Sequence, residues 1–277
     1  MLPYPLAPFF SVCILPSAMF TDPLHVISGE LTGDAALDTA ISRAILVRVD
    51  SGELPATLQV GMPHRVVAFG KHDVVTPGFT KAVDVAREQG FDTTVRIAGG
   101  RAVVFHPGTI RFAWTVPVEA PADTMHARFA ALAQAVVATL AAFDVAAEVG
   151  ELPNEYCAGS YSVHLKNGAK VMGVGQRLSR HAAQVGGMIV VNDPSTINSV
   201  LGPIYGHLGI GFDPDMTGAL SDVRLLEPDS VATVLTESLA PDGAPVPSSV
   251  DAITSDLGSS MRRDHVPQHL RERTEPS

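Results

Sequence analysis

Apolar residues recur at helical spacing in three parts of the chain. Between residues 34 and 49 they return every three or four positions, and Asp34 is a candidate N-cap. Residues 79–89 show apolar positions in a polar, alanine-rich setting and end at Gly90, a residue type that commonly terminates helices. Residues 123–143 are rich in alanine and carry a third apolar face. The pattern predicts a helix in each segment.

Short apolar runs bounded by Gly or Pro predict β-strands between these helices. They occupy residues 57–60, 65–69, 93–97, 102–105 and 109–116. Farther along, three more runs predict an antiparallel meander with a tight turn at Asn167-Gly168. These runs are residues 160–165, 169–178 and 182–191. Grouped strands with a few helices packed on one side, without regular β-α-β alternation, predict an α+β fold with antiparallel or mixed sheets.

The composition divides the 277-residue chain into three parts. Residues 1–20 are apolar and proline-rich, but no Lys or Arg precedes the apolar run and the run is too short to span a bilayer, so we expect no signal peptide or membrane span. Translation that starts at Met19 would remove most of this extension. Residues 21–212 hold the patterned elements and form the expected main domain. Residues 213–277 form a small extension with one helix near 231–239, and Pro, Ser and Asp enrichment predicts a loosely ordered tail.

Charge and cysteine content narrow the function classes. The chain has 19 Lys plus Arg and 29 Asp plus Glu, and this net charge of −10 argues against a nucleic-acid surface. Cys13 and Cys157 are its two cysteines, so we expect no disulfide framework and a cytoplasmic location. Neither His72 nor His106 has a partner at metal-ligand spacing, and no metal site is predicted.

Two adjacent glycines flanked by arginines precede a β-branched run between Arg96 and His106. Gly99 and Gly100 can adopt positive φ and expose their amides, and the neighbouring arginines supply cations. Together these groups would hold a carboxylate, phosphate or thioester oxygen. The alternative is an ordinary hairpin turn, for which diglycine is a common signal.

Lys170 follows the predicted Asn167-Gly168 turn, a place where lysines are usually solvated. Gly173 and Gly175 interrupt the strand that follows, and glycines within a strand mark a bulge or a close approach of backbone or ligand. A lysine beside such a gap would reach a bound acyl group. It would stabilise negative charge on a carbonyl oxygen or help a thiol to ionise.

Cys157 lies in a loop-like stretch that leads into the lysine hairpin. Most unpaired cysteines are buried space-fillers without a chemical role. A thiol on a loop beside a lysine, by contrast, is of the kind that ionises and attacks thioesters. Both interpretations of Cys157 stay open.

The two glycine-bearing segments resemble the lipoate-protein ligase and octanoyltransferase family, which includes biotin protein ligases. In that family Arg-Arg-x-x-Gly-Gly-Gly-Ala-Val-x-His lines the acyl pocket, and Gly-x-Lys-[Ile/Val]-x-Gly-x-Ala-Gln-x-Arg carries the essential lysine. The stretches Arg96 to His106 and Gly168 to Arg177 match these motifs. The likeness covers most of the chain between Ala35 and Gly211. It implies an α+β catalytic domain that delivers a medium-chain acyl group to one lysine of a lipoyl carrier domain.

The resemblance implies that Lys170 is catalytic. It also implies a set of residues around the acyl group, namely Arg96, Gly99, Gly100, Arg101, Ala102, Val103, His106, Gly173 and Gln176, with the last two beside the lysine. Three departures imply a reshaped pocket. Arg101 replaces the third glycine, Thr109 replaces an asparagine, and Gln184-Val185-Gly186-Gly187 stands where the family has a His-Gly pair.

Two reactions of the family, and a third possibility, stay open for this chain. A transferase would need no cofactor: Cys157 would take the acyl group from acyl carrier protein as a thioester, and Lys170 would stabilise the oxyanion. A ligase would activate free lipoate with ATP and Mg²⁺, Lys170 would contact the adenylate, and Cys157 would be incidental. In either case the acceptor would be the lipoyl domain of a 2-oxoacid dehydrogenase or a glycine cleavage protein, with no nucleic-acid or membrane partner. A degenerate relative would bind an acyl group or lipoyl domain without catalysis.

Overall fold

A computed structural model describes residues 23–29, 32–240 and 243–273. Within these residues the strands form two sheets. The larger sheet has the strand order β11-β1-β2-β6-β10-β9-β8-β7, with β1 parallel to β2 and β11 and antiparallel pairing elsewhere. Its strands are β1 (His25–Ser28), β2 (Thr57–Gly61), β6 (Thr109–Pro117), β7 (Ala147–Val149), β8 (Val163–Leu165), β9 (Lys170–Leu178), β10 (Ala182–Val190) and β11 (Val246–Ser248). The expectations for residues 1–20, Met19 and Cys13 lie outside the described residues.

The smaller sheet has the order β4-β3-β5 and consists of β3 (Val66–Phe69), β4 (Asp92–Val95) and β5 (Val103–Phe105). In this sheet β4 runs parallel to β3, whereas β5 runs antiparallel to it. Both sheets are therefore mixed, which confirms the predicted α+β class. The predicted meander is confirmed by the antiparallel order β10-β9-β8.

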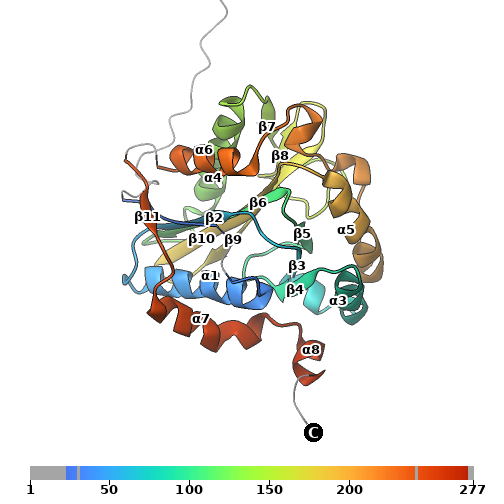
Figure 1. Ribbon diagram of the computed structural model, residues 1–277, viewed down its shortest axis with the longest axis horizontal. Helices are drawn as coiled ribbons and strands as arrows, with labels where there is room; N and C mark the ends of the chain where they lie inside the picture. Colours follow the sequence, from blue (N-terminus) through green and yellow to red (C-terminus); the bar gives the residue numbers. More distant parts are fainter. Residues whose placement is uncertain (1–22, 30–31, 241–242, 274–277) are drawn as a thin grey trace, which may run out of the picture.

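Helices cover both faces of the larger sheet, so the expectation that they lie on one side is wrong. Figure 1 shows α1 and α7 on one side of the sheet and α4 and α6 on the other. The helices are α1 (Ala35–Asp50), α2 (Lys71–Val74), α3 (Phe79–Glu88), α4 (Met125–Ala141), α5 (Pro194–Leu208), α6 (Pro228–Ser238), α7 (Ala252–His265) and α8 (Gln268–Arg273). Along β6, Ile110, Phe112 and Trp114 belong to the core shared with α4 and α6. The alternate residues of β6 face α1, so both faces need cover.

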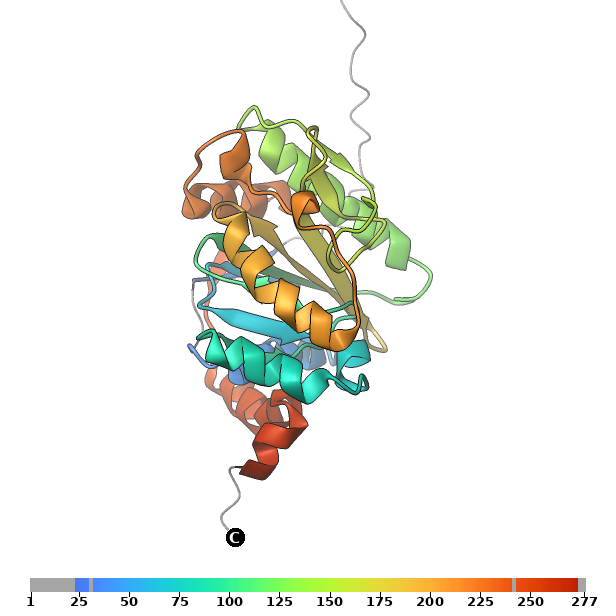
Figure 2. The same ribbon diagram turned by 90° about the vertical axis from the view of Figure 1, so that its right-hand side faces the viewer.

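The three predicted helices are confirmed as α1, α3 and α4. Asp34 caps α1 by accepting a hydrogen bond from the Leu37 amide at 2.9 Å. Helix α5 was not predicted, because Pro203 and two glycines, Gly202 and Gly206, interrupt its sequence pattern. This helix lies beside α3 (Figure 2), and the two helices share an apolar core with the smaller sheet.

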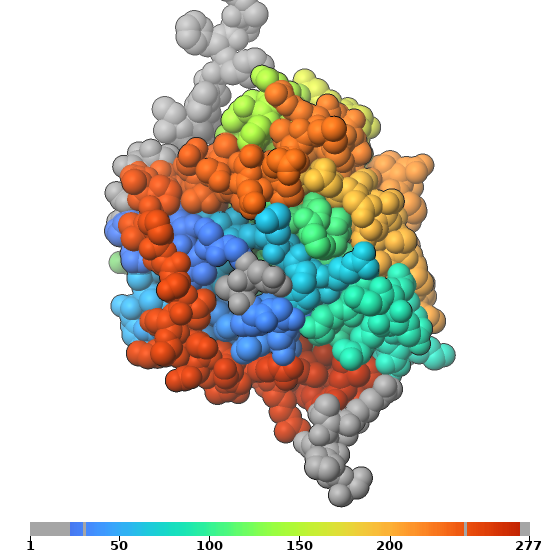
Figure 3. Space-filling view, in the orientation of Figure 1, coloured from blue at the N-terminus to red at the C-terminus, as the bar shows by residue number. Residues whose placement is uncertain are grey.

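The C-terminal extension is folded, and the expectation of a loosely ordered tail is wrong for residues 243–273. Strand β11 pairs with β1, and α7 packs along α1. The Arg48 guanidinium donates to both carboxylate oxygens of Asp251 at 2.7 Å and to the Thr254 hydroxyl at 2.6 Å. In Figure 3 the C-terminal segment, in red, borders the blue N-terminal elements. The domain boundary near residue 212 stays a prediction.

None of the helices in the described part of the chain is both long and apolar enough to cross a membrane. The cytoplasmic location expected from the cysteine content stays a prediction.

The contact between α1 and α7 predicts opposite effects of alanine at two helical glycines. A Cβ atom at Gly258 in α7 would lie 2.7 Å from Ile41 Cγ1 and 3.1 Å from Ile41 Cα, whereas one at Gly206 in α5 would meet nothing within 4 Å. We expect Gly258→Ala to lower the free energy of unfolding by about 1–3 kcal/mol. The control Gly206→Ala should raise it by about 0.5–1 kcal/mol. Urea denaturation measures both, and an equal gain at both positions would contradict the tight α1–α7 contact.

Candidate active site

The diglycine loop crosses the smaller sheet from one edge to the other. It leaves β4 and enters β5, and these strands lie on opposite sides of β3. The hairpin alternative is therefore wrong, because the two flanking strands do not pair. Gly100 has φ 99°, and Gly99 does not share this left-handed region. A Cβ atom at Gly70 would overlap the Gly100 carbonyl oxygen, so the loop packs directly on the end of β3.

The loop comes together with Cys157, which lies 61 positions after Arg96 in the chain. The Sγ atom of Cys157 lies 3.3 Å from Arg96 Nη2 and 3.3 Å from the Arg101 backbone nitrogen. A Cβ atom at Gly100 would lie 2.8 Å from this sulfur, so glycine leaves the room that the thiol occupies. The thiol thus accepts two hydrogen bonds from the diglycine loop, one of them from a cation.

The backbone of Cys157 is fixed in an unusual conformation. Its φ is 44°, a left-handed value that non-glycine residues rarely adopt. Its N–H donates to the Tyr205 hydroxyl at 3.1 Å, and its C=O accepts from Lys170 Nζ at 3.0 Å. The Tyr205 hydroxyl in turn donates to the Ala102 carbonyl at 2.9 Å. Side chains from α5 and β9 therefore hold this strained backbone, and with it the thiol, in place.

The Lys170 side chain is fully buried, and its ammonium group donates its hydrogen bonds to the loop that carries Cys157. Its Nζ donates to Glu155 Oε1 at 2.9 Å, to the Tyr156 carbonyl at 2.9 Å and to the Cys157 carbonyl at 3.0 Å. An ammonium group has three N–H donors, so all of them are used. Glu155 also accepts from the Ser162 hydroxyl at 2.5 Å. In this arrangement Lys170 holds the loop that carries Cys157, and its catalytic role stays a prediction.

The surroundings of Cys157 favour its thiolate form. Burial raises the pKa of the Cys157 thiol, but the charges of Arg96 and Lys170 lower it. The hydrogen bonds from the Arg101 amide and the Arg96 guanidinium also lower it, and the resulting pKa lies below that of an ordinary cysteine. The site therefore combines a thiol, a fixed cation and a glycine-bearing loop.

The structure places the other residues that the resemblance implied at varying distances from this centre. A Cβ atom at Gly173 would lie 3.3 Å from Lys170 Cε, so Gly173 adjoins the lysine. The expectation that Gln176 also does so is wrong. Gln176 lies six residues farther along β9, about 20 Å for extended chain, and it accepts from Arg128 Nε at 2.7 Å.

The remaining residues that the resemblance implied lie in the diglycine loop, in β5 or in the turn after it. Arg101 directs its guanidinium to the buried Asp73, at 3.4 Å. Val103 is buried between the smaller sheet and its helices. His106 accepts from the Gly108 amide at 3.1 Å and shapes the turn after β5, and it makes no hydrogen bond with Cys157 or Lys170.

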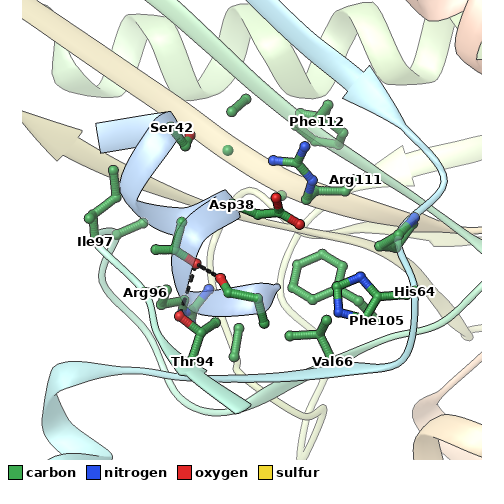
Figure 4. Close-up of a pocket in the computed structure, with 18 of the residues that line it drawn as sticks. Asp38, Ser42, His64, Val66, Thr94, Arg96, Ile97, Phe105, Arg111 and Phe112 are labelled. Atoms are coloured by element: carbon green, nitrogen blue, oxygen red, sulfur yellow. Dashed lines mark hydrogen bonds between the residues drawn. The ribbon is translucent and has the colours of Figure 1, made fainter. Parts of the chain in front are cut away.

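A cavity of about 130 Å³ lies beside this centre, between α1, β6, β10 and residues 94–98 (Figure 4). Arg96 lines the cavity and also contacts the Cys157 sulfur, so it belongs to both. Sequence reasoning missed Asp38 and Arg111, which line the cavity, and also Tyr205. A signal existed for Arg111, a lone charge within an apolar strand, and for Asp38 on the apolar helix 34–49. Tyr205 carried no such signal.

Within the described ranges, no group of three or more His, Cys, Asp or Glu side chains is placed to hold a metal ion.

The arrangement of sheets and helices is that of lipoate-protein ligases. A bipartite lipoate protein ligase from Thermoplasma acidophilum matches with a TM-score of 0.69 at 16% identity, over 87% of this chain and 92% of that one. LipL1 of P. falciparum, solved in complex with lipoate, matches with a TM-score of 0.62 at 11% identity, over 87% and 71%. At these identities the likeness defines the class of fold.

The family follows from the sequence. Residues 34–206 match the family model described as lipoyl protein ligase A/B catalytic domain, and the chain belongs to this family. The octanoyl-[GcvH]:protein N-octanoyltransferase of Geobacillus kaustophilus is 27% identical over 176 residues, which are 64% of this chain and 62% of that protein. The lipoyl-[GcvH]:protein N-lipoyltransferase of Listeria monocytogenes is 22% identical over 198 residues, 68% and 69% of the two chains. The chain thus spans about three-fifths of the length of the first of these relatives.

Removal of the Arg96 charge should raise the pKa of Cys157. We expect Arg96→Met to move the rise of iodoacetamide reactivity at Cys157 to higher pH, because a cation beside the sulfur stabilises the thiolate. The reaction is followed at the Cys157 peptide by mass spectrometry across a pH series. Arg177→Met is the matched control, since Arg177 is exposed and makes no hydrogen bond with Cys157. An unchanged profile in Arg96→Met would show that this guanidinium does not activate the thiol.

Proposed function

We propose that this protein is an acyltransferase of protein lipoylation that carries a medium-chain acyl group as a thioester on Cys157. The observation that supports it most is the position of the sulfur. It accepts hydrogen bonds from Arg96 and from the Arg101 amide, and its pKa is lowered. A partly buried thiol in such surroundings is a nucleophile and not merely a space-filler.

The proposed reaction has two steps. In the first, the Cys157 thiolate attacks the carbonyl carbon of an acyl thioester, and the donor thiol leaves with a proton from solvent. In the second, the neutral amine of an acceptor lysine attacks the enzyme thioester, an amide forms, the amine loses a proton, and the thiolate is regenerated. The Arg96 guanidinium, 3.3 Å from the sulfur, is the nearest fixed cation for the negative charge that develops on the carbonyl oxygen.

The role proposed for Lys170 is to position the loop and to lower the pKa of the thiol. An oxyanion contact would need a free N–H donor, and all three donors of Lys170 serve the loop. The same geometry weighs against the ligase reading, in which Lys170 would reach the carboxylate and α-phosphate of an adenylate. No cofactor is required by the proposed transferase.

The proposed acceptor is a lipoyl carrier domain. The names of the two relatives above give an acyl-[GcvH] donor and a protein acceptor, and we propose that the acceptor of the present chain is a protein of the lipoyl-carrier type. As donor we propose octanoyl carrier protein, and octanoylated GcvH is the second donor to be compared. A lipoyl domain of a 2-oxoacid dehydrogenase serves as the test acceptor.

The decisive experiment measures octanoyl transfer to a lipoyl domain without ATP. We expect transfer from octanoyl carrier protein or octanoylated GcvH, and a decrease of about a thousandfold or more in Cys157→Ala. The product is the acylated lipoyl domain, detected by intact mass. Ser160→Ala is the matched control, since Ser160 is exposed on the same loop.

Two other results would replace this proposal. Transfer that needs free lipoate and ATP, and that survives Cys157→Ala, would assign the ligase reaction. Binding of a lipoyl domain or acyl donor without transfer under either condition would assign a non-catalytic relative.

A further inference from the structure

Arg111 lines the cavity beside the thiol and has no hydrogen-bond partner among the residues that the structure describes. It projects from the third position of β6 toward α1, on the face opposite the apolar residues Ile110 and Phe112. Its guanidinium makes no hydrogen bond or ion pair with any residue of the described ranges. Burial lowers the pKa of Arg111 and the Asp38 carboxylate opposes this shift, yet an arginine stays protonated in proteins. The cavity therefore holds a cation with unused donors.

Asp38, on α1, faces the same space with one unused oxygen (Figure 4). The Thr32 amide and hydroxyl donate to Asp38 Oδ1 at 2.9 and 2.6 Å. Asp38 Oδ2 accepts nothing from the residues that the structure describes. The side chain attracts Arg111 without forming an ion pair with it. Unused donors and an unused acceptor thus flank one space.

Several other polar side chains of the cavity wall, namely Thr39, Thr94 and Gln184, have partners within the protein, whereas Arg96 Nε has none among the described residues. The hydroxyl oxygens of Thr39 and Thr94 lie 2.9 Å apart and share a hydrogen bond. Gln184 donates to the Ser42 carbonyl at 3.0 Å and to the Thr115 hydroxyl at 2.8 Å. Arg111 and Asp38 are half-buried beside the cavity, so the unused donors of one and the unused acceptor of the other can receive a polar ligand group.

Two contacts connect the cavity to the reacting thiol. Arg96 lines the cavity and reaches the sulfur. Gly187 also lines it and lies against Gly173, which adjoins Lys170. Its volume of about 130 Å³ is similar to that of an engineered cavity of about 150 Å³ that binds benzene. The cavity therefore has room for about the outer six atoms of a chain.

We propose that this cavity receives the far end of the acyl chain, and that Arg111 and Asp38 select a chain ending in a hydroxyl over the hydrocarbon end of octanoyl. The inference rests on the proposed function and adds the chemical class of the acyl group. A hydroxyl accepts from Arg111 and donates to Asp38, and it leaves the near-zero net charge of the pair unchanged. A terminal carboxylate would be attracted by Arg111 but repelled by Asp38.

Direct binding of free acids tests this selection without any transfer step. Isothermal titration calorimetry compares 8-hydroxyoctanoate, octanoate and octanedioate on the full chain. We expect 8-hydroxyoctanoate to bind about 10- to 100-fold more tightly than octanoate, because hydrogen bonds to charged groups would otherwise be left unmade. Arg111→Met should remove this preference and should favour octanoate. The matched control Arg180→Met, at an exposed turn, should retain it.

Several results would overturn the inference. They are equal or tighter binding of octanoate, tightest binding of octanedioate, no binding of any of the acids, and a preference that survives Arg111→Met. The comparison of the three acids on the unaltered protein tests the preference for a terminal hydroxyl even if Arg111→Met does not fold. Octanoyl transfer through Cys157 without a preference for the hydroxyl overturns this inference and leaves the proposed function intact. Arg111-dependent binding of 8-hydroxyoctanoate without transfer of any acyl group would contradict the proposed function and leave the selection by Arg111 intact.

Discussion

The buried ion pair between Lys170 and Glu155 is the interaction on which the site depends. Both side chains are withdrawn from water, and each charge is compensated by the other and by hydrogen bonds to the loop that carries Cys157. Loss of one partner from such a pair leaves a buried charge without compensation, which costs about 3–5 kcal/mol. The pair therefore fixes the loop firmly. Through the loop it also fixes a left-handed cysteine that would otherwise relax.

The two apolar cores meet at this loop. Lys170 begins β9 of the larger sheet, whereas Tyr205 belongs to α5, which packs with the smaller sheet. The backbone of Cys157 forms hydrogen bonds with both side chains, and its sulfur accepts a hydrogen bond from the loop that crosses the smaller sheet. Because elements from both sheets converge on one residue, the position of the thiol depends on the packing of the whole domain. A rigid thiol between fixed cations suits the proposed reaction, in which the acyl group is taken from a donor and then passed to an acceptor.

The sequence predicts what depends on local spacing and misses what depends on distant packing. The Asp34 cap and the turn before Lys170 were visible because each is a short-range pattern. The contact between Arg96 and Cys157 was not, because 61 positions separate them and the strand order that joins them is not encoded locally. Helix α5 was hidden by Pro203, and α7 by a polar composition that becomes helical through its docking on α1. The charge of Arg111 is evident in the sequence, but the face of β6 on which it lies depends on how β6 pairs and packs within the larger sheet.

The central claim is that Lys170 holds the cysteine loop in place, and hydrogen exchange tests it most directly. Lys170→Met is compared with the matched control Lys166→Met, since Lys166 is exposed in the turn just before β9. We expect Lys170→Met to speed backbone amide exchange across residues 152–160 and 97–102, because the carbonyls of Tyr156 and Cys157 lose their shared donor. Lys166→Met should leave both segments protected. Unchanged exchange in both segments of a folded Lys170→Met protein would contradict the account.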